Sequence, residues 1–414
     1  MTDPTIYRSR KRPRAAGHLP TELLLEIVGR TDPATVVRCA ATSKELRRHI
    51  ADPAFHGCLR LRRSKCFIPS LLRGYLLEDR DEGLHLDSTS ADATKLPSVG
   101  KCTPITARGG LVLVRRYDPE HDLCVYSPAT GRSQALPPEP NFNGICVLLV
   151  RDGVGGAVGR PFQVLTVNSF FISGPLCSLQ IQTFLSEKGT WGPLTDVPTP
   201  LMHGVTGLRR QSKHLVISDT VHWLCYSDKK YYVLKLHVRE EAKVTVTKLP
   251  PSFHRACSFP TARPAQILLA TDTVDGSPIV LVSNNQRILS WGGSKLTRKW
   301  KEKPQVVIEN EALLPFTNES GLMQASLGRV QLEWFGEKSG VVLIKTSLRV
   351  PEWDGLTRWR TVPFYFWLDL GNKEIIGWSN GSWNVGSKSG VSCNVGCPYE
   401  IDLSSWVPTL CKTL

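Results

Sequence analysis

The 414-residue sequence predicts a multidomain α+β protein, in which a short N-terminal helical hairpin precedes a large, mainly-β domain. Apolar residues recur at the three- and four-residue spacing of a helix only near the N-terminus, and beyond residue 66 short apolar alternations are separated by turn sequences. Strand–turn–strand units then recur along the chain, which favours an irregular β-propeller. We expect a basic disordered tail over residues 1–17, a helical domain over 18–58, a connecting segment with an acidic surface loop over 59–98, and a β-rich domain over 99–414.

The tail carries a compact basic run, whose members are Arg8, Arg10, Lys11, Arg12 and Arg14. Residues 1–73 contain 15 lysine and arginine residues against 6 aspartate and glutamate residues, whereas the rest of the chain contains 36 against 31. Such a run is typical of a nuclear import signal, with a solvated tail as the alternative. No aromatic residue interleaves it, which speaks against a nucleic-acid contact. No apolar run nears the roughly 18 residues of a membrane helix, so we expect a location in the nucleus, the cytoplasm or both.

The helical hairpin follows from local chemistry. Pro20 suits a first helical turn, and Glu22 places negative charge where the helix dipole favours it. Asp32-Pro33 ends this helix. Its apolar stripe comprises Leu23, Leu24, Ile27 and Val28. A second stripe predicts one further helix that stops at Asp52-Pro53, and it comprises Val36, Cys39, Ser43, Leu46 and Ile50.

Residues 18–55 also match a known pattern without a gap, through Leu19-Pro20, Glu22-Leu23-Leu24, Ile27-Val28, Arg30, Lys44, Ile50, Asp52-Pro53 and Phe55. This segment resembles an F-box, the short helical adaptor that docks a protein onto the Skp subunit of a cullin-type ubiquitin ligase. Four positions depart from the pattern: Thr31, Thr42, Ser43, and Leu46, which stands where a tryptophan is usual. The resemblance implies that the adaptor contact and hairpin core come from Leu19, Pro20, Leu23, Ile27, Val28, Val36, Leu46 and Ile50. A hairpin that packs only on its own protein is the alternative.

Five strand–turn–strand units are predicted in the β-domain. Residues 123–126 precede a turn at 127–131, 179–184 meet Trp191, 231–238 meet 244–249, 287–291 meet Trp300, and 364–367 meet 375–378. The first four begin near 123, 179, 231 and 287, which is close to the kelch-type propeller period of about 50 residues. A kelch-like ring is therefore favoured, with a β-sandwich or a pair of β-domains as the alternative. In a ring, the final strand, predicted over 399–403, would pair with the first blade and remove an open edge.

A second resemblance extends over the C-terminal portion. Residues 125–132 with Leu136-Pro137-Pro138 are similar to the "Asn-Pro-x-Thr-Gly, then Leu-Pro" segment common after plant F-boxes, and residues 219–224 to their "Tyr/His-Trp-Leu" strand. Residues 68–74 and 398–403 resemble parts of the grass F-box families that carry an uncharacterised C-terminal β-domain.

Signals for catalysis, cofactors and metals are weak. The glycine-rich segment 153–159 is followed by a strand where phosphate binding needs a helix, so it is interpreted as a hairpin loop. His222 beside Asp219 and Ser218 is interpreted as an exposed or half-buried strand residue, because neighbours in one strand alternate faces. Cys393 and Cys397 are close together without a second pair, so reduced thiols are expected rather than a zinc site. We expect no cofactor. The 11 tryptophans are expected to fill blade cores, with a carbohydrate or ligand platform as the alternative.

The F-box resemblance implies a non-catalytic substrate receptor of a Skp–cullin–F-box ubiquitin ligase. Its helical domain would bind a Skp-type adaptor, and through it a cullin, while the β-domain would bind a protein target for ubiquitylation. A non-degradative F-box protein, a ligand-binding β-domain and a basic nucleic-acid binder remain alternatives.

Overall fold

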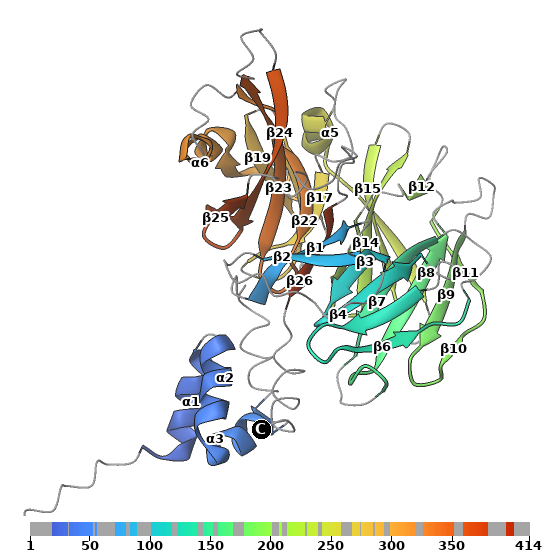
Figure 1. The fold of residues 1–414 in the computed structure, drawn as a ribbon. Helices are drawn as coiled ribbons and strands as arrows, with labels where there is room; N and C mark the ends of the chain where they lie inside the picture. Colours follow the sequence, from blue (N-terminus) through green and yellow to red (C-terminus); the bar gives the residue numbers. More distant parts are fainter. Residues whose placement is uncertain are drawn as a thin grey trace, which may run out of the picture.

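The computed structural model describes residues 19–31, 33–52, 54–55, 71–79, 83–88, 101–117, 123–138, 144–151, 156–168, 178–200, 207–208, 213–227, 230–238, 242–257, 267–273, 275–284, 286–293, 299–319, 326–351, 359–379 and 395–400. A helical region and a β-domain are distinct bodies (Figure 1). None of the described helices has the length and apolar character needed to span a membrane.

The helical region consists of α1 (Thr21–Arg30), α2 (Pro33–Thr42) and α3 (Lys44–Ile50). They pack around a small core of Val28, Val36, Ala40 and Ile50. The single second helix predicted from the sequence is wrong, because Ser43 separates α2 from α3. Ser43 has an extended backbone and its side chain accepts a hydrogen bond from the Leu46 amide at 3.3 Å, which caps α3.

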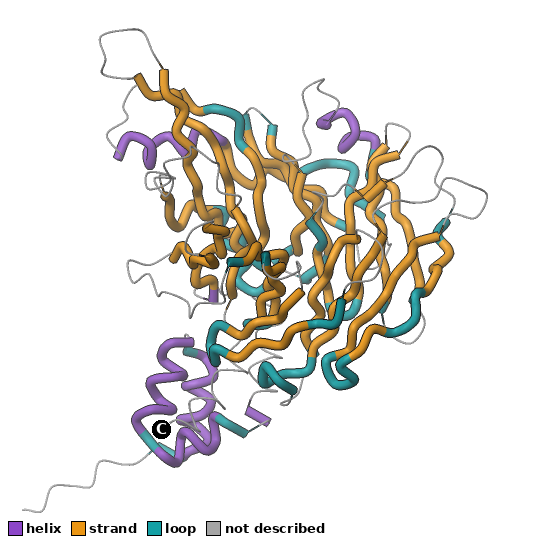
Figure 2. The backbone as a smooth tube through the Cα atoms, turned by 45° about the vertical axis from the view of Figure 1, so that its right-hand side comes forward, coloured by secondary structure: helices purple, strands orange, loops and turns teal. Residues whose placement is uncertain are grey.

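The β-domain consists of antiparallel sheets, six of them within the described residues (Figure 2), and we number them as blades 1 to 6. Blade 1 contains β1 (Leu72–Asp79), β2 (Gly83–Ser88) and β26 (Val395–Glu400), and blade 2 contains β3 (Cys102–Arg108), β4 (Leu111–Arg116), β5 (Leu123–Ser127) and β6 (Arg132–Ala135). Blade 3 contains β7 (Gly144–Val150), β8 (Phe162–Asn168), β9 (Ser178–Leu185), β10 (Thr190–Trp191) and β11 (Thr195–Pro198). Blade 4 contains β12 (Gly207–Leu208), β13 (Leu215–Ile217), β14 (Thr220–Ser227), β15 (Lys230–His237) and β16 (Lys243–Lys248). Blade 5 contains β17 (Ile267–Thr271), β18 (Pro278–Ser283), β19 (Arg287–Gly292) and β20 (Gln305–Glu309). Blade 6 contains β21 (Ser326–Leu327), β22 (Gln331–Phe335), β23 (Val341–Pro351), β24 (Trp359–Asp369) and β25 (Glu374–Ser379).

Three short helices connect blades. Helix α5 (Pro251–Cys257) follows blade 4, and the 3-10 helix η3 (Asn310–Leu313) continues into α6 (Leu314–Glu319) between blades 5 and 6.

The blades form a closed ring. Apolar clusters join blade 1 to 2 (Leu76 with Val114), 2 to 3 (Leu113 with Leu148), 3 to 4 (Leu165 with Trp223), 4 to 5 and 6 (Val233, Leu281 and Ile344) and 6 back to 1 (Trp367 with Tyr75). The strands β26, β3, β7, β17 and β22 contact their neighbours at the centre. The β-domain is therefore a β-propeller, and the predicted fold class is confirmed.

The last strand closes the ring, as predicted. β26 pairs antiparallel with β1, with Leu72 opposite Glu400 and Gly74 opposite Tyr399. Its position is corrected, since the described strand runs from Val395 to Glu400 and the remainder of the predicted 399–403 segment lies outside the described residues.

Most predicted hairpins are confirmed. β5 pairs with β6, β9 with β10, β15 with β16, and β24 with β25. Two local predictions are corrected. The partner of β19 is β20, while Trp300 makes only an isolated bridge to Gly293. Residues 83–88, predicted as surface loop, form β2, because Leu84 and Leu86 pack into the cluster between blades 1 and 2.

Candidate functional site

Helix α1 has two apolar sides. Val28 is buried in the three-helix core, whereas Leu19, Leu23 and Ile27 are 53%, 47% and 52% exposed. Leu23 and Ile27 are four residues apart and lie on one side of α1, whereas Leu19 lies two residues before the helix begins. We call these three residues the α1 apolar stripe. Exposed Pro20 precedes the helix, and its carbonyl accepts the Leu24 amide in the first turn.

Polar contacts hold α1 against the other helices. The Thr21 hydroxyl donates to Glu45 Oε1 at 3.1 Å, which links α1 to α3. Arg47 Nε donates to the Ala40 carbonyl at 2.9 Å, which links α3 to α2. The α1 apolar stripe is thus carried on a small but cross-linked helical unit.

The structure separates the eight residues predicted for the adaptor contact and hairpin core. Leu19, Pro20, Leu23 and Ile27 are exposed. Val28, Val36 and Ile50 are buried in the helical core, and Leu46 is half-buried against it. Sequence spacing could not separate these two groups, because α1 is apolar on both sides.

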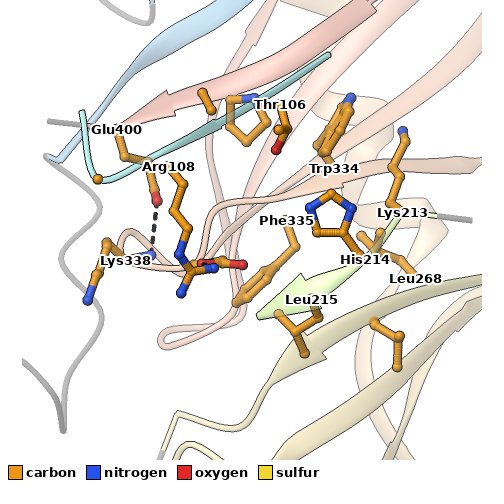
Figure 3. A pocket seen from close by; sticks show the side chains of 15 residues that line it. Thr106, Arg108, Lys213, His214, Leu215, Leu268, Trp334, Phe335, Lys338 and Glu400 are labelled. Atoms are coloured by element: carbon orange, nitrogen blue, oxygen red, sulfur yellow. Dashed lines mark hydrogen bonds and ion pairs between the residues drawn. The ribbon is translucent and has the colours of Figure 1, made fainter. Parts of the chain in front are cut away.

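A second candidate is a small cavity at the centre of the propeller (Figure 3), lined by residues of five blades. Arg108 of β3 forms an ion pair with Glu337 at 2.5 Å and donates to the Val216 carbonyl at 3.2 Å. The Val216 amide in turn donates to Glu337 Oε1 at 3.0 Å. Three blades are therefore linked across the centre.

Lys213 makes a second link across the cavity. Its ammonium group lies 3.3 Å from Glu333 Oε2 and 4.4 Å from the centre of the Trp334 ring. Burial lowers the pKa of Lys213, and Glu333 acts in the opposite direction. Burial, with a smaller effect of Arg108, also lowers the pKa of His214 to about 4, so this imidazole is neutral at physiological pH.

This cavity has little capacity for a ligand. Its volume of about 40 Å³ accommodates roughly three water molecules. Of its charged lining residues, Arg108 pairs with Glu337 and Lys213 pairs with Glu333, while Glu400 accepts the backbone amides of Lys338 and Ser339. The cavity was missed by sequence reasoning, because separate blades bring its residues together.

His222 and Cys397, which the sequence analysis considered for catalysis and metal binding, are buried in the blades. His222 is 4% exposed, so the predicted exposed or half-buried position is wrong; blade 4 is covered on both faces by its neighbours. Cys397 is a fully buried free thiol in β26. Within the described part of the chain, no three His, Cys, Asp or Glu side chains are grouped to hold a metal ion. Cys393, like the basic run of Arg8, Arg10, Lys11, Arg12 and Arg14, lies outside the described residues.

A known protein family matches most of the β-domain. A family described as a domain of unknown function, DUF7595, matches residues 92–350. The chain belongs to the DUF7595 family. In this member, a second family described as F-box-like matches residues 16–62, which contain the three helices and the α1 apolar stripe.

A plant protein is also similar to this chain. "Putative F-box protein At3g23960" of Arabidopsis thaliana is 25% identical over 207 residues, which cover 45% of this chain and 51% of the relative. The chain thus spans about half the length of this curated relative.

Some solved structures are also similar to this chain. TolB from Acinetobacter baumannii is 10% identical, with a TM-score of 0.36 over 73% of this chain and 61% of TolB. A six-bladed fungal lectin from Aleuria aurantia is 12% identical, with a TM-score of 0.35 over 73% of this chain and 88% of the lectin. Both scores are low, and the blade order given above rests on the sheets of this chain.

Proposed function

We propose that this chain is the substrate-recognition subunit of a Skp–cullin–F-box ubiquitin ligase. The helical region would bind the Skp-type adaptor, and the β-propeller would hold a target protein near the recruited conjugating enzyme. The chain itself would perform no chemistry and would contribute proximity. The order of motifs in the β-domain further supports a place among the grass-type F-box proteins.

The observation that carries the proposal is the α1 apolar stripe within the F-box-like segment. Three large apolar side chains are about half exposed on one small helical unit, although its core residues are fully buried. A contiguous exposed apolar surface is typical of a protein interaction site. Leu23 and Ile27, four residues apart on α1, together with Leu19 just before the helix would be the apolar anchors for the partner.

The test is recovery of a Skp-type adaptor with purified full-length chain. The double substitution Leu19→Ala with Ile27→Ala removes two exposed anchors, each worth about 0.75 to 1.5 kcal/mol at half the burial of a full side chain. Adaptor affinity should therefore fall by about 10- to 150-fold. Because both side chains are exposed, the thermal melting of the chain should stay unchanged.

The matched control is Leu194→Ala with Ile376→Ala, which removes two similarly exposed apolar side chains from the β-domain, at 51% and 45% exposure. This variant should recover the adaptor normally. Unchanged recovery by Leu19→Ala with Ile27→Ala would refute the adaptor contact.

Two alternatives differ in their readouts. A non-degradative F-box protein would recover the adaptor but support no ubiquitin transfer to a bound target in a reconstituted ligase. A carbohydrate-binding or ligand-binding β-domain needs a pocket with free convergent polar groups. The central cavity is a poor candidate for such a pocket, since its lining residues Arg108, Lys213 and Glu400 already have partners within the protein.

A further inference from the structure

The positive charge of the β-domain is concentrated in one stretch. Residues 227–303 contain 14 lysine and arginine residues against 6 aspartate and glutamate residues. The flanking stretches are slightly acidic, with 13 against 14 over residues 74–226 and 9 against 11 over residues 304–414. The excess therefore belongs to the end of blade 4, to α5 and to blade 5.

The fold gathers part of this charge around α5. The Ser252 hydroxyl of α5 donates to the Glu302 carbonyl and accepts a hydrogen bond from Trp291 Nε1 at 3.2 Å, which ties the helix to blade 5 and to the segment over 299–303. His254 contacts blade 4, with Nε2 3.0 Å from the Leu249 carbonyl and Nδ1 accepting the Tyr231 amide at 3.3 Å. Lys230 and Lys248 end the neighbouring strands of blade 4 beside this helix.

Six exposed cations result, which we call the α5 basic patch: Lys230, Lys248, Arg255, Lys299, Lys301 and Lys303. The segment over 299–303 adds a single carboxylate, Glu302. The electrostatic effect is visible at His254, whose pKa is lowered first by burial and further by Lys248 and Lys230. Clustering like charges opposes folding, so the patch is better explained by attraction of an anionic partner than by stability.

We propose that the α5 basic patch binds an acidic segment of a protein, and that this is the target-binding surface of the proposed ubiquitin-ligase subunit. The proposal rests on the proposed function for the identity of the partner as a target. Figures 1 and 2 show α5 at the opposite end of the β-domain from α1–α3. A partner on this patch therefore leaves the α1 apolar stripe accessible.

The chemistry favours an acidic protein segment over nucleic acid. Four aromatic side chains of this region, Tyr231, Phe253, Trp291 and Trp300, are buried, and Tyr226 and Tyr232 are partly buried, so none is fully exposed as a stacking surface for bases. Five of the six cations are lysines, which act as point charges, whereas bidentate phosphate recognition uses arginine.

The experiment titrates a fluorescent Glu-Ser repeat peptide with the full-length chain in the absence of adaptor. Lys248→Glu with Arg255→Glu should weaken peptide binding by about tenfold, because two attractive contacts become repulsive. The matched control, Arg132→Glu with Lys188→Glu, makes the same change of net charge at exposed positions of blades 2 and 3 and should change affinity less than about twofold. A Gln-Ser repeat peptide should not bind.

Three outcomes would overturn the proposal: equal weakening by both variants, equal binding of the Gln-Ser peptide, or displacement of the peptide by single-stranded DNA at lower concentration than by unlabelled peptide. Adaptor recovery by Lys248→Glu with Arg255→Glu should remain normal. Normal adaptor recovery without peptide binding would refute the patch alone, whereas peptide binding without adaptor recovery would refute the ubiquitin-ligase role alone.

Discussion

His222 is a buried histidine of blade 4 whose protonation opposes folding. Burial lowers its pKa from 6.5 to about 4, and the charge of Lys235, which is paired with it across β14 and β15, acts in the same direction. The unfolded chain therefore binds a proton at pH values where the folded chain does not. The stability that this residue contributes is complete above pH 6.5 and is lost as the pH falls toward about 4.

We expect His222 alone to lower the free energy of unfolding by about 2 kcal/mol between about pH 7.5 and about pH 5. Urea unfolding at the two pH values measures this difference. His222→Gln should lose less stability than the unaltered chain over this interval, because the titrating group is gone. Val233→Ala, a buried change in the same blade, should instead lower stability equally at both pH values. Identical pH dependence of His222→Gln and the unaltered chain would contradict this account.

At the scale of elements, sequence patterns predicted the helices and hairpins whose contacts lie between residues close together in the sequence. A hairpin such as β15–β16 follows from two apolar alternations and the turn between them. The existence of α1 likewise follows from the spacing of its apolar residues, but this spacing did not separate the exposed Leu23 and Ile27 from the buried Val28. β2 was missed because it lies in an acidic stretch, although it pairs with the adjacent β1 and packs into the apolar cluster shared with blade 2. The break at Ser43 depends on one capping hydrogen bond that an apolar pattern does not reveal.

Glu400 at the end of β26 makes a contact between residues far apart in the sequence. Its carboxylate accepts the Lys338 amide at 3.1 Å and the Ser339 amide at 2.7 Å, and so holds the turn between β22 and β23 to the closing strand. Glu400→Ala leaves both amides without this acceptor and should reduce the free energy of unfolding by about 2 to 3 kcal/mol. Glu400→Gln keeps one acceptor oxygen and should cost less. Denaturant unfolding of both variants measures the difference, and equal stability of Glu400→Ala and the unaltered chain would exclude this role.

At the scale of the whole molecule, the helical unit and the ring expose different chemistry. The helical unit presents the α1 apolar stripe, whereas the blades bury most of their large apolar residues against one another and present the α5 basic patch. Links across the centre, Arg108 to Glu337 and Lys213 to Glu333, join blades 2, 4 and 6. A closed and cross-linked ring suits a receptor, because it holds surface residues of distant blades in a fixed arrangement.

Pairing of β26 with β1 closes the ring, and its loss should destabilise the β-domain. Stopping the chain after Gly396 removes Cys397 and Tyr399, whose side chains are 0% and 3% exposed, and leaves β1 with an open edge. Burial of Tyr399 alone is worth about 1.5 to 3 kcal/mol, and the pairing with β1 is lost with it. The whole β-domain should therefore lose soluble yield and cooperative melting, whereas removal of residues 411–414 should be tolerated. Gly396→Ala should also destabilise the intact chain, because the added carbon meets the Leu76 carbonyl and Pro104. Equal and cooperative melting of the two truncated chains would show that the blades do not depend on closure by β26.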